Sequence, residues 1–186
     1  MRIISGTLKG RSINFLKNSI TRPLKDSVKE NIFNILKHSN LIDVVIENSN
    51  ILDLYSGIGS FGLESISRGA RNVTFVEQDK NAANILEKNI IHLGVSSNVT
   101  TINNKVENFL KNNRKEKFNI FFLDPPFSEK KFIQDLNLIK ECNIYEVKHI
   151  IIIHRERETV DNFHNFFKII TTKQYGRSKI IFGVFN

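Results

Sequence analysis

The sequence is poor in several residue types that would indicate other classes of protein. Its 186 residues include one cysteine, three prolines and no tryptophan. Because Cys142 is alone, an intrachain disulfide or a multi-cysteine metal site is excluded. The chain has no apolar run long enough to cross a membrane and no signal-peptide pattern near residue 1. No group of His, Cys and Asp has metal-ligand spacing, so no metal is expected. These absences favour a reducing, cytoplasmic compartment.

Acidic residues are scarce in the first fifth of the chain. The net charge is +8, and residues 1–37 contain eight basic and two acidic residues, so +6 lies there and only +2 on the other 149 residues. Compositional drift toward lysine would spread the charge, whereas a local basic field attracts a polyanion. We therefore expect residues 1–37 to form a basic, nucleic-acid-facing extension, and residues 38–186 to form the main domain. The expected phosphate contacts are Arg2, Lys9, Arg11, Arg22, Lys25 and Lys29.

Short apolar runs alternate with helical patterns from residue 50 onward, which predicts an α/β fold with a doubly wound, mostly parallel sheet. Residues 2–16 have β-prone stretches around two glycines and predict an N-terminal β-hairpin extension. The last two runs flank a turn and predict a closing hairpin. Strands are expected at residues 51–55, 73–77, 99–103, 119–124, 149–154, 167–174 and 179–185, and helices near residues 26–37, 60–68, 81–93, 106–112 and 131–140.

A glycine-rich turn follows the strand predicted at residues 51–55. Asp53 precedes Gly57 and Gly59, and glycine lets the backbone approach a ligand closely. In open parallel sheets, ligands bind at the carboxyl ends of the strands. Glu77 ends the next strand, where its carboxylate can accept both hydroxyl protons of a ribose. The segment predicts a nucleoside-containing ligand.

The same glycines spell GxGxxG through Gly62, so a nicotinamide enzyme is one alternative. A strand–helix turn without any ligand is another. Asp53 argues against the nicotinamide interpretation because an anion so close would repel a pyrophosphate. S-adenosylmethionine lacks phosphate, and its cationic amino and sulfonium groups suit an aspartate. We therefore favour S-adenosylmethionine as the cofactor.

A second motif, Asp124-Pro125-Pro126-Phe127, follows the apolar run at residues 120–123. In a doubly wound sheet, this strand lies beside the one predicted at residues 51–55, so Asp124 should face the same crevice as Gly57. An aryl amine is a poor nucleophile because its lone pair is delocalised. A carboxylate and a proline carbonyl can each accept one N–H and direct the lone pair at a methyl group, while Asp124 stabilises the developing positive charge. Phe127 can stack on a base. The motif predicts methylation of an exocyclic amine.

With these motifs, the chain resembles the bacterial methyltransferases that modify guanine N2 in small-subunit (16S) ribosomal RNA. The likeness covers nearly the whole length, through residues 2–11, 21–23, 28–36, 53–62, 124–127 and 175–176. It implies a seven-stranded Rossmann-like methyltransferase fold and an S-adenosylmethionine-dependent rRNA (guanine-N2-)-methyltransferase. It also implies that the substrate is 16S RNA within a partly assembled small subunit, and we expect a monomer.

The resemblance further predicts cofactor contacts by Tyr55, Gln78, Asn104 and Lys105. The family usually has an acidic residue where this chain has Lys105. The acceptor for the adenine amino group is then either Asn104 or a backbone carbonyl.

Two alternative functions stay open. The Asp-Pro-Pro-Phe motif serves any exocyclic amine, so an adenine-N6 methyltransferase acting on DNA or RNA is one alternative. The second is a non-catalytic RNA-binding assembly factor, against which the intact Asp124 argues. His154 ends the strand predicted at residues 149–154, beside Arg155, and is interpreted as a hydrogen-bonded strand-end histidine.

Overall fold

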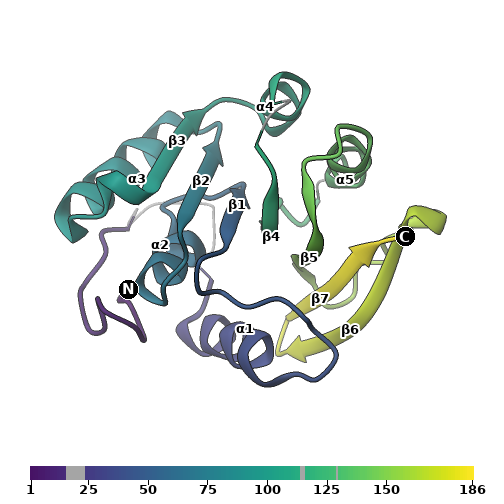
Figure 1. Ribbon diagram of the computed structural model, residues 1–186, viewed down its shortest axis with the longest axis horizontal. Coiled ribbons are helices and arrows are strands. Elements are labelled where there is room, and N and C mark those ends of the chain that lie inside the picture. Colours follow the sequence, from purple (N-terminus) through teal and green to yellow (C-terminus); the bar gives the residue numbers. More distant parts are fainter. Residues whose placement is uncertain (16–23, 114–115, 129) are drawn as a thin grey trace.

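The protein is described by a computed structural model that covers residues 1–15, 24–113, 116–128 and 130–186. The described residues form one seven-stranded sheet of order β3-β2-β1-β4-β5-β7-β6 (Figure 1). The strands are β1 Asn50–Leu54, β2 Asn72–Glu77, β3 Val99–Asn103, β4 Phe118–Leu123, β5 Tyr145–Glu156, β6 Phe167–Tyr175 and β7 Ser178–Phe185. The α-helices are α1 Asp26–His38, α2 Ser60–Ser67, α3 Lys80–Leu93, α4 Val106–Asn112 and α5 Phe132–Glu141. The predicted doubly wound, mostly parallel sheet is confirmed.

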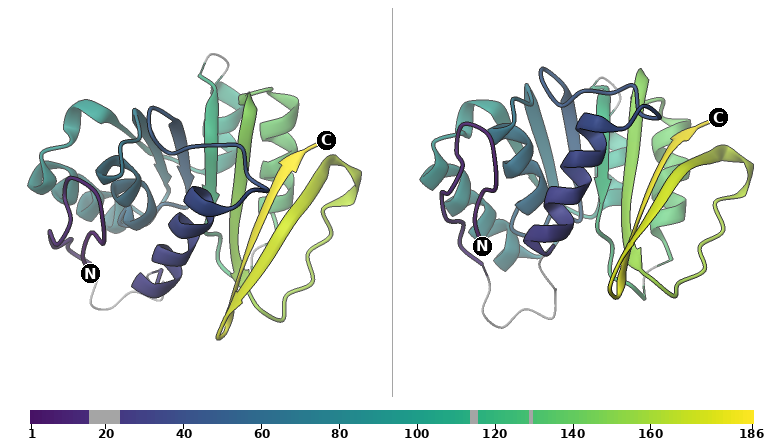
Figure 2. Two further views of the ribbon diagram at one scale, coloured as in Figure 1. Left: turned by 60° about the horizontal axis from the view of Figure 1, so that its bottom comes forward. Right: turned by 90° about the horizontal axis from the view of Figure 1, so that it is seen from below.

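The sheet is covered by helices on both faces, which explains its continuous apolar strands. In β4, Ile120 and Phe122 pack with α1, α2 and α3 in one cluster. Phe121 and Leu123 point to the other face and pack with α4 and α5. Figures 1 and 2 show these two helical layers. A central strand buried on both sides holds its terminal residues at fixed positions.

The order of the strands places β1 beside β4. These two strands are parallel, with Leu54 opposite Leu123. Because β2 lies on the other side of β1, the winding direction of the chain reverses between β1 and β4, and ligands bind at such a point. β7 is antiparallel to β5, with Ser178 opposite Glu156. The β6–β7 turn therefore reaches the edge at which β4 and β5 end.

Residues 1–15 run antiparallel, as expected, but they form one bridge, between Arg2 and Ser12, and no regular strand. Helix α2 takes several of the backbone donors instead. The N–H groups of Ile4 and Ser5 donate to the Glu64 carboxylate at 2.8 and 3.0 Å. These contacts attach the N-terminal segment to α2, beside which it lies in Figure 2. The division at residue 37 stays a prediction.

Candidate active site

The turn between β1 and α2 depends on residues with positive φ. Tyr55, Gly57 and Gly59 have φ values of 57°, 54° and 83°. A Cβ on Gly59 would lie 2.4 Å from Leu86 Cδ1, whereas a Cβ on Gly57 would meet nothing within 4 Å. Gly59 therefore lets α2 pack against α3, and Gly57 leaves open space over the turn.

Asp53 lies beneath this turn and is 1% exposed. Its Oδ2 accepts a hydrogen bond from the Gly62 N–H at 3.0 Å. Within the described ranges, the buried side-chain oxygens without a partner are Asp53 Oδ1 and Ser56 Oγ, and both belong to this segment. Burial raises the pKa of Asp53 well above its usual value. An unpartnered buried carboxylate oxygen is costly, and a cationic ligand group would supply the missing partner.

Glu77 connects the end of β2 to the same turn. Its Oε2 accepts from the Gly57 N–H at 2.7 Å, and its Oε1 accepts from the Asp79 N–H at 2.8 Å. Each carboxylate oxygen can accept a second hydrogen bond. Glu77 can therefore also accept the two hydroxyl protons of a ribose.

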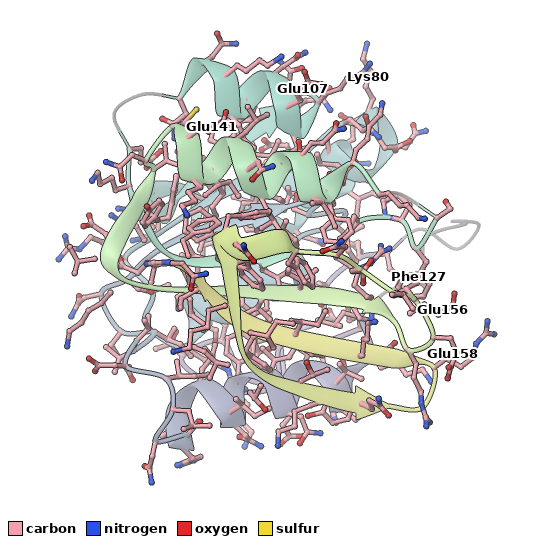
Figure 3. All side chains as sticks on the ribbon, turned by 90° about the vertical axis from the view of Figure 1, so that its right-hand side faces the viewer. Lys80, Glu107, Phe127, Glu141, Glu156 and Glu158 are labelled. Carbon is pink, nitrogen blue, oxygen red and sulfur yellow. The ribbon has the colours of Figure 1, made fainter. Side chains whose placement is uncertain are left out.

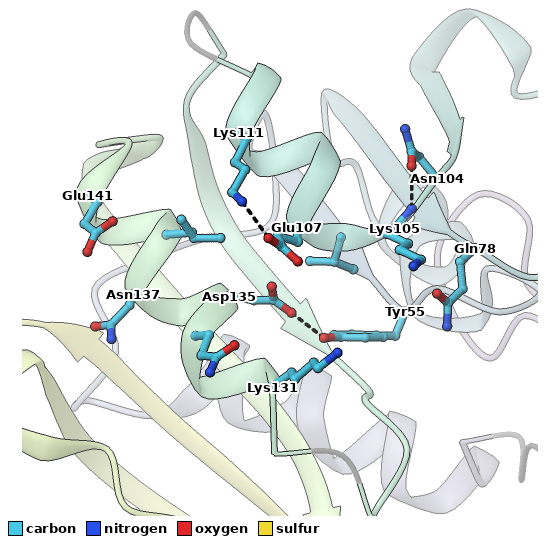
Figure 4. Close-up of a pocket in the computed structure, with 13 residues that line it drawn as sticks. Tyr55, Gln78, Asn104, Lys105, Glu107, Lys111, Lys131, Asp135, Asn137 and Glu141 are labelled. Atoms are coloured by element: carbon cyan, nitrogen blue, oxygen red, sulfur yellow. Dashed lines mark hydrogen bonds and ion pairs between the residues drawn. The ribbon is translucent and has the colours of Figure 1, made fainter.

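A pocket of about 480 Å³ lies beside this turn, between α4 and α5 (Figure 4). Tyr55, Gln78, Asn104 and Lys105 line it, so the structure brings these four predicted cofactor residues together. The Tyr55 hydroxyl donates to Asp135 of α5. These residues surround a space that extends from the turn after β1 toward the start of α4.

Asn104 already accepts two hydrogen bonds through Oδ1. The donors are the Lys105 N–H at 2.8 Å and Asn108 Nδ2 at 3.0 Å. An amide oxygen has two lone pairs, so this oxygen is occupied in the present conformation. Lys105, a cation, accepts no hydrogen bond. Which of the two alternatives, Asn104 or a backbone carbonyl, accepts the adenine amino group stays a prediction.

The Asp-Pro-Pro-Phe segment continues directly from β4. The Asp124 N–H donates to the Leu54 carbonyl at 3.4 Å, so Asp124 lies against the start of the β1 turn. Pro125 is buried, Pro126 is exposed and Phe127 is partly exposed. Figure 3 shows Phe127 at the same end of the sheet as Glu156, the last residue of β5, and Glu158. The two predicted motifs therefore face one edge.

His154 of β5 holds one oxygen of the Asp124 carboxylate. Its Nδ1 lies 2.8 Å from Asp124 Oδ1, and its Nε2 lies 2.9 Å from Ser178 Oγ. The predicted hydrogen-bonded strand-end histidine is confirmed, but sequence reasoning did not identify its partners. Asp124 Oδ2 makes no hydrogen bond with any described residue.

Arg155 is the main residue of the site that sequence reasoning missed. It is 1% exposed, and its guanidinium donates to the carbonyls of Pro126 at 3.2 Å and Phe127 at 3.0 Å. It also pairs with the buried Asp161 at 3.3 Å and lies 4.5 Å from the centroid of the Phe132 ring. Prolines donate no N–H, so the loop is fixed through its carbonyls. The sequence feature that could have identified Arg155 is a basic residue at the end of an apolar strand beside this motif.

The predicted phosphate contacts differ in exposure. Arg2, Lys9, Arg11 and Lys25 are exposed, and Arg22 lies outside the described residues. Lys29 is fully buried, 3.6 Å from Glu64, and burial lowers its pKa. The prediction for Lys29 is wrong because its ammonium group also donates to the Arg2 carbonyl and cannot reach a ligand outside. Its structural role is to join α1, α2 and the N-terminal segment.

Two kinds of feature are absent from the described part of the chain. No helix there is long and apolar enough to span a membrane. The same residues contain no group of three or more His, Cys, Asp or Glu side chains able to hold a metal ion.

The fold and the two motifs at its switch point define the class of Rossmann-like methyltransferases. Residues 1–184 match the family described as Conserved hypothetical protein 95, and the chain belongs to that family. It is 38% identical over 160 residues to Ribosomal RNA small subunit methyltransferase D of Haemophilus influenzae, covering 85% of this chain and 80% of that protein. The Escherichia coli (strain K12) protein of the same name is 31% identical over 158 residues, covering 85% and 76%.

Solved structures agree with this assignment. The structure of yhhF from Escherichia coli superimposes with a TM-score of 0.83 and 26% identity, covering 98% of this chain and 96% of that one. An RNA methyltransferase from Salinibacter ruber superimposes with a TM-score of 0.64 and 12% identity, covering 87% and 92%. The second likeness shows the fold alone.

Proposed function

We propose that this protein transfers a methyl group from S-adenosylmethionine to the exocyclic N2 amino group of a guanine in 16S ribosomal RNA. The observation that carries the proposal is the juxtaposition of Asp124, at the tip of β4, with the turn after β1. The names of its relatives support a substrate in small-subunit ribosomal RNA.

The residues around the β1 turn fit this cofactor. When bound, S-adenosylmethionine supplies a methyl group activated by its sulfonium. Asp53 Oδ1 and Ser56 Oγ, which have no hydrogen-bond partner among the described residues, are suited to the cationic amino end. Glu77 is suited to the ribose, and the pocket at Tyr55 and Gln78 to the adenine. The amino end, the ribose and the adenine thus each have a suitable group or space around the turn.

The tip of β4 fits an aryl amine. Asp124 Oδ2 and the Pro125 carbonyl accept no hydrogen bond from any described residue. In the proposed complex, each accepts one N–H of the amine and directs the nitrogen lone pair at the methyl group. The Asp124 carboxylate stabilises the positive charge that develops on nitrogen. Phe127 stacks on the base, a contact worth about 1–3 kcal/mol.

The test is transfer of labelled methyl groups to small subunits, or their precursors, from cells that lack this protein, followed by nucleoside analysis. We expect N2-methylguanosine as the product. The Asp124→Ala variant should lose about 10²- to 10³-fold in kcat, while its Kd for S-adenosylmethionine stays within about threefold. N6-methyladenosine as the product would favour the alternative function. An Asp124→Ala variant with the wild-type rate would refute the catalytic site.

Arg2, Lys9 and Arg11 are proposed to contact RNA phosphates, together with Lys25 and Arg22. Each phosphate contact contributes about 0.7–0.9 to the slope of log K against log salt concentration. Replacing Arg2, Lys9 and Arg11 with Gln should therefore lower the slope by about 2. The control replaces Lys117, Lys148 and Lys168, three exposed lysines distant in sequence from this segment, and should leave the slope unchanged. Equal slopes for the two triple variants would show that the N-terminal charge does not bind RNA.

A further inference from the structure

We propose that His154 is a positioning residue that fixes the orientation of the Asp124 carboxylate toward the target amine. It does so by donating its Nδ1–H to Asp124 Oδ1, which leaves Oδ2 for the substrate. The inference rests on the proposed function, because it assigns the orientation of the carboxylate that accepts the amine N–H. It gives β5 a second residue in the site, next to Arg155, which holds the loop after β4.

The His154 ring is held on several sides. Its side chain is 7% exposed, against 26% for Asp124. The ring lies between Asp124 Oδ1 at 2.8 Å and Ser178 Oγ at 2.9 Å, so both ring nitrogens have partners. The Phe127 ring meets it edge-on, with 5.5 Å between centroids. The imidazole therefore has a fixed place between β4 and β7.

The partners also determine which nitrogen of the neutral ring carries the proton. An ionised carboxylate only accepts hydrogen bonds, so Nδ1 must bear a proton to face Asp124 Oδ1. The Ser178 hydroxyl can donate to Nε2, which then needs no proton. The arrangement selects the Nδ1–H tautomer of neutral His154.

The consequence concerns the rotation of the Asp124 carboxylate. The final torsion of an aspartate is soft and roughly two-fold, so without a partner the carboxylate would sample many orientations. With Oδ1 bound to His154, Oδ2 is the oxygen left for the amine, and together with the Pro125 carbonyl it supplies the two acceptors of the proposed complex. Two fixed acceptors match the two N–H groups of one exocyclic amine. A misplacement near 1 Å at such a site can cost about 10²-fold in rate.

Two variants of similar size separate positioning from simple packing. In His154→Asn, the amide NH₂ takes the place of Nδ1 and can still donate to Asp124. In His154→Gln, the amide reaches the place of Nε2 and Ser178, with no donor at Asp124. We expect His154→Gln to lose about 10- to 100-fold in kcat with an unchanged KM for S-adenosylmethionine, and His154→Asn to stay within about threefold of the wild type.

A merely structural role would give a different pattern. Both His154 variants would then lose kcat in proportion to their loss in Tm, and equal kcat values for Asn and Gln would overturn the proposal. An independent readout is the tautomer of His154 by ¹⁵N NMR at a pH where the ring is neutral. A proton on Nδ1 is expected, and a proton on Nε2 alone would overturn the proposal whatever the activity.

The same assays distinguish this failure from failure of the proposed function. If the wild type transfers no methyl to guanine, the proposed function fails, while the tautomer still tests the contact between His154 and Asp124. If the wild type is active and His154→Gln matches it in kcat, only the positioning role fails.

Discussion

The turn after β1 and the loop after β4 lie side by side, yet they are held in different ways. The turn is shaped by its own backbone, through the positive φ values of Gly57 and Gly59 and the Gly62 N–H that reaches Asp53. The loop is held by side chains of β5, because Arg155 donates to two of its carbonyls. Glycines supply conformational freedom and N–H donors, whereas prolines supply neither. A rigid loop of prolines therefore requires donors from elsewhere in the fold.

The largest expected effect comes from replacing Arg155, whose side chain supports the loop after β4. Arg155→Met leaves the Asp161 side chain, which is 4% exposed, with Lys179 at 3.6 Å as its remaining cationic partner among the described residues. Breaking a buried ion pair typically costs about 3–5 kcal/mol, so we expect the free energy of unfolding in urea to fall by that amount. Arg157→Met is the control because the Arg157 side chain is 50% exposed, and it should change stability by about 0.5 kcal/mol or less. If Arg155→Met and Arg157→Met were equally stable, Arg155 would not be a special support of the loop after β4. The contrast between that loop and the turn after β1 would then not hold.

The two glycines of the turn allow a matched comparison within one segment. Gly59→Ala places a Cβ against Leu86 in a left-handed backbone conformation, and should cost about 2–4 kcal/mol in urea denaturation. Gly57→Ala has the same backbone strain without the clash, and should cost about 1–2 kcal/mol. A Gly57→Ala variant that is the less stable of the two would show that packing against α3 does not set this turn.

A smaller effect is expected from Asp53→Asn. If Asp53 pairs with the cationic end of the cofactor, loss of the charge should weaken binding about tenfold, which corresponds to about 1.4 kcal/mol. Asp43→Asn, at an exposed side chain, is the control and should not change binding in titration calorimetry. Undiminished affinity in Asp53→Asn would mean that the turn holds its ligand without this carboxylate.

The Asp53→Asn variant should also change how the free energy of unfolding depends on pH in the absence of cofactor. Burial raises the pKa of Asp53 in the folded state, so the unfolded chain releases this proton first as the pH rises. The free energy of unfolding due to Asp53 therefore falls between its ordinary pKa, near 4, and its raised value. Asp53→Asn should lack this decline, so its stability relative to the wild type should increase with pH over that window. A constant difference between the two proteins would argue against a raised pKa.

Much of the fold and part of the site could be predicted from local patterns. The alternation of apolar runs and helical periodicity located β3 and α4 at residues 99–103 and 106–112, as observed. The glycines marked the turn, and the Asp-Pro-Pro-Phe motif marked the neighbouring strand end. Lys29 was misjudged because a charge in a helical sequence gives no sign of a buried partner, and Glu64 lies 35 positions away.

The sequence by itself determined the order of the elements, the family and the two motifs, because backbone propensity and apolar periodicity act over a few neighbouring residues. Only the tertiary structure decided which side chains support those motifs. His154 meets Asp124 across 30 positions, and Arg155 meets Pro126 across 29. The physical reason is that such hydrogen bonds depend on strand order and register, and the packing of the whole sheet sets both.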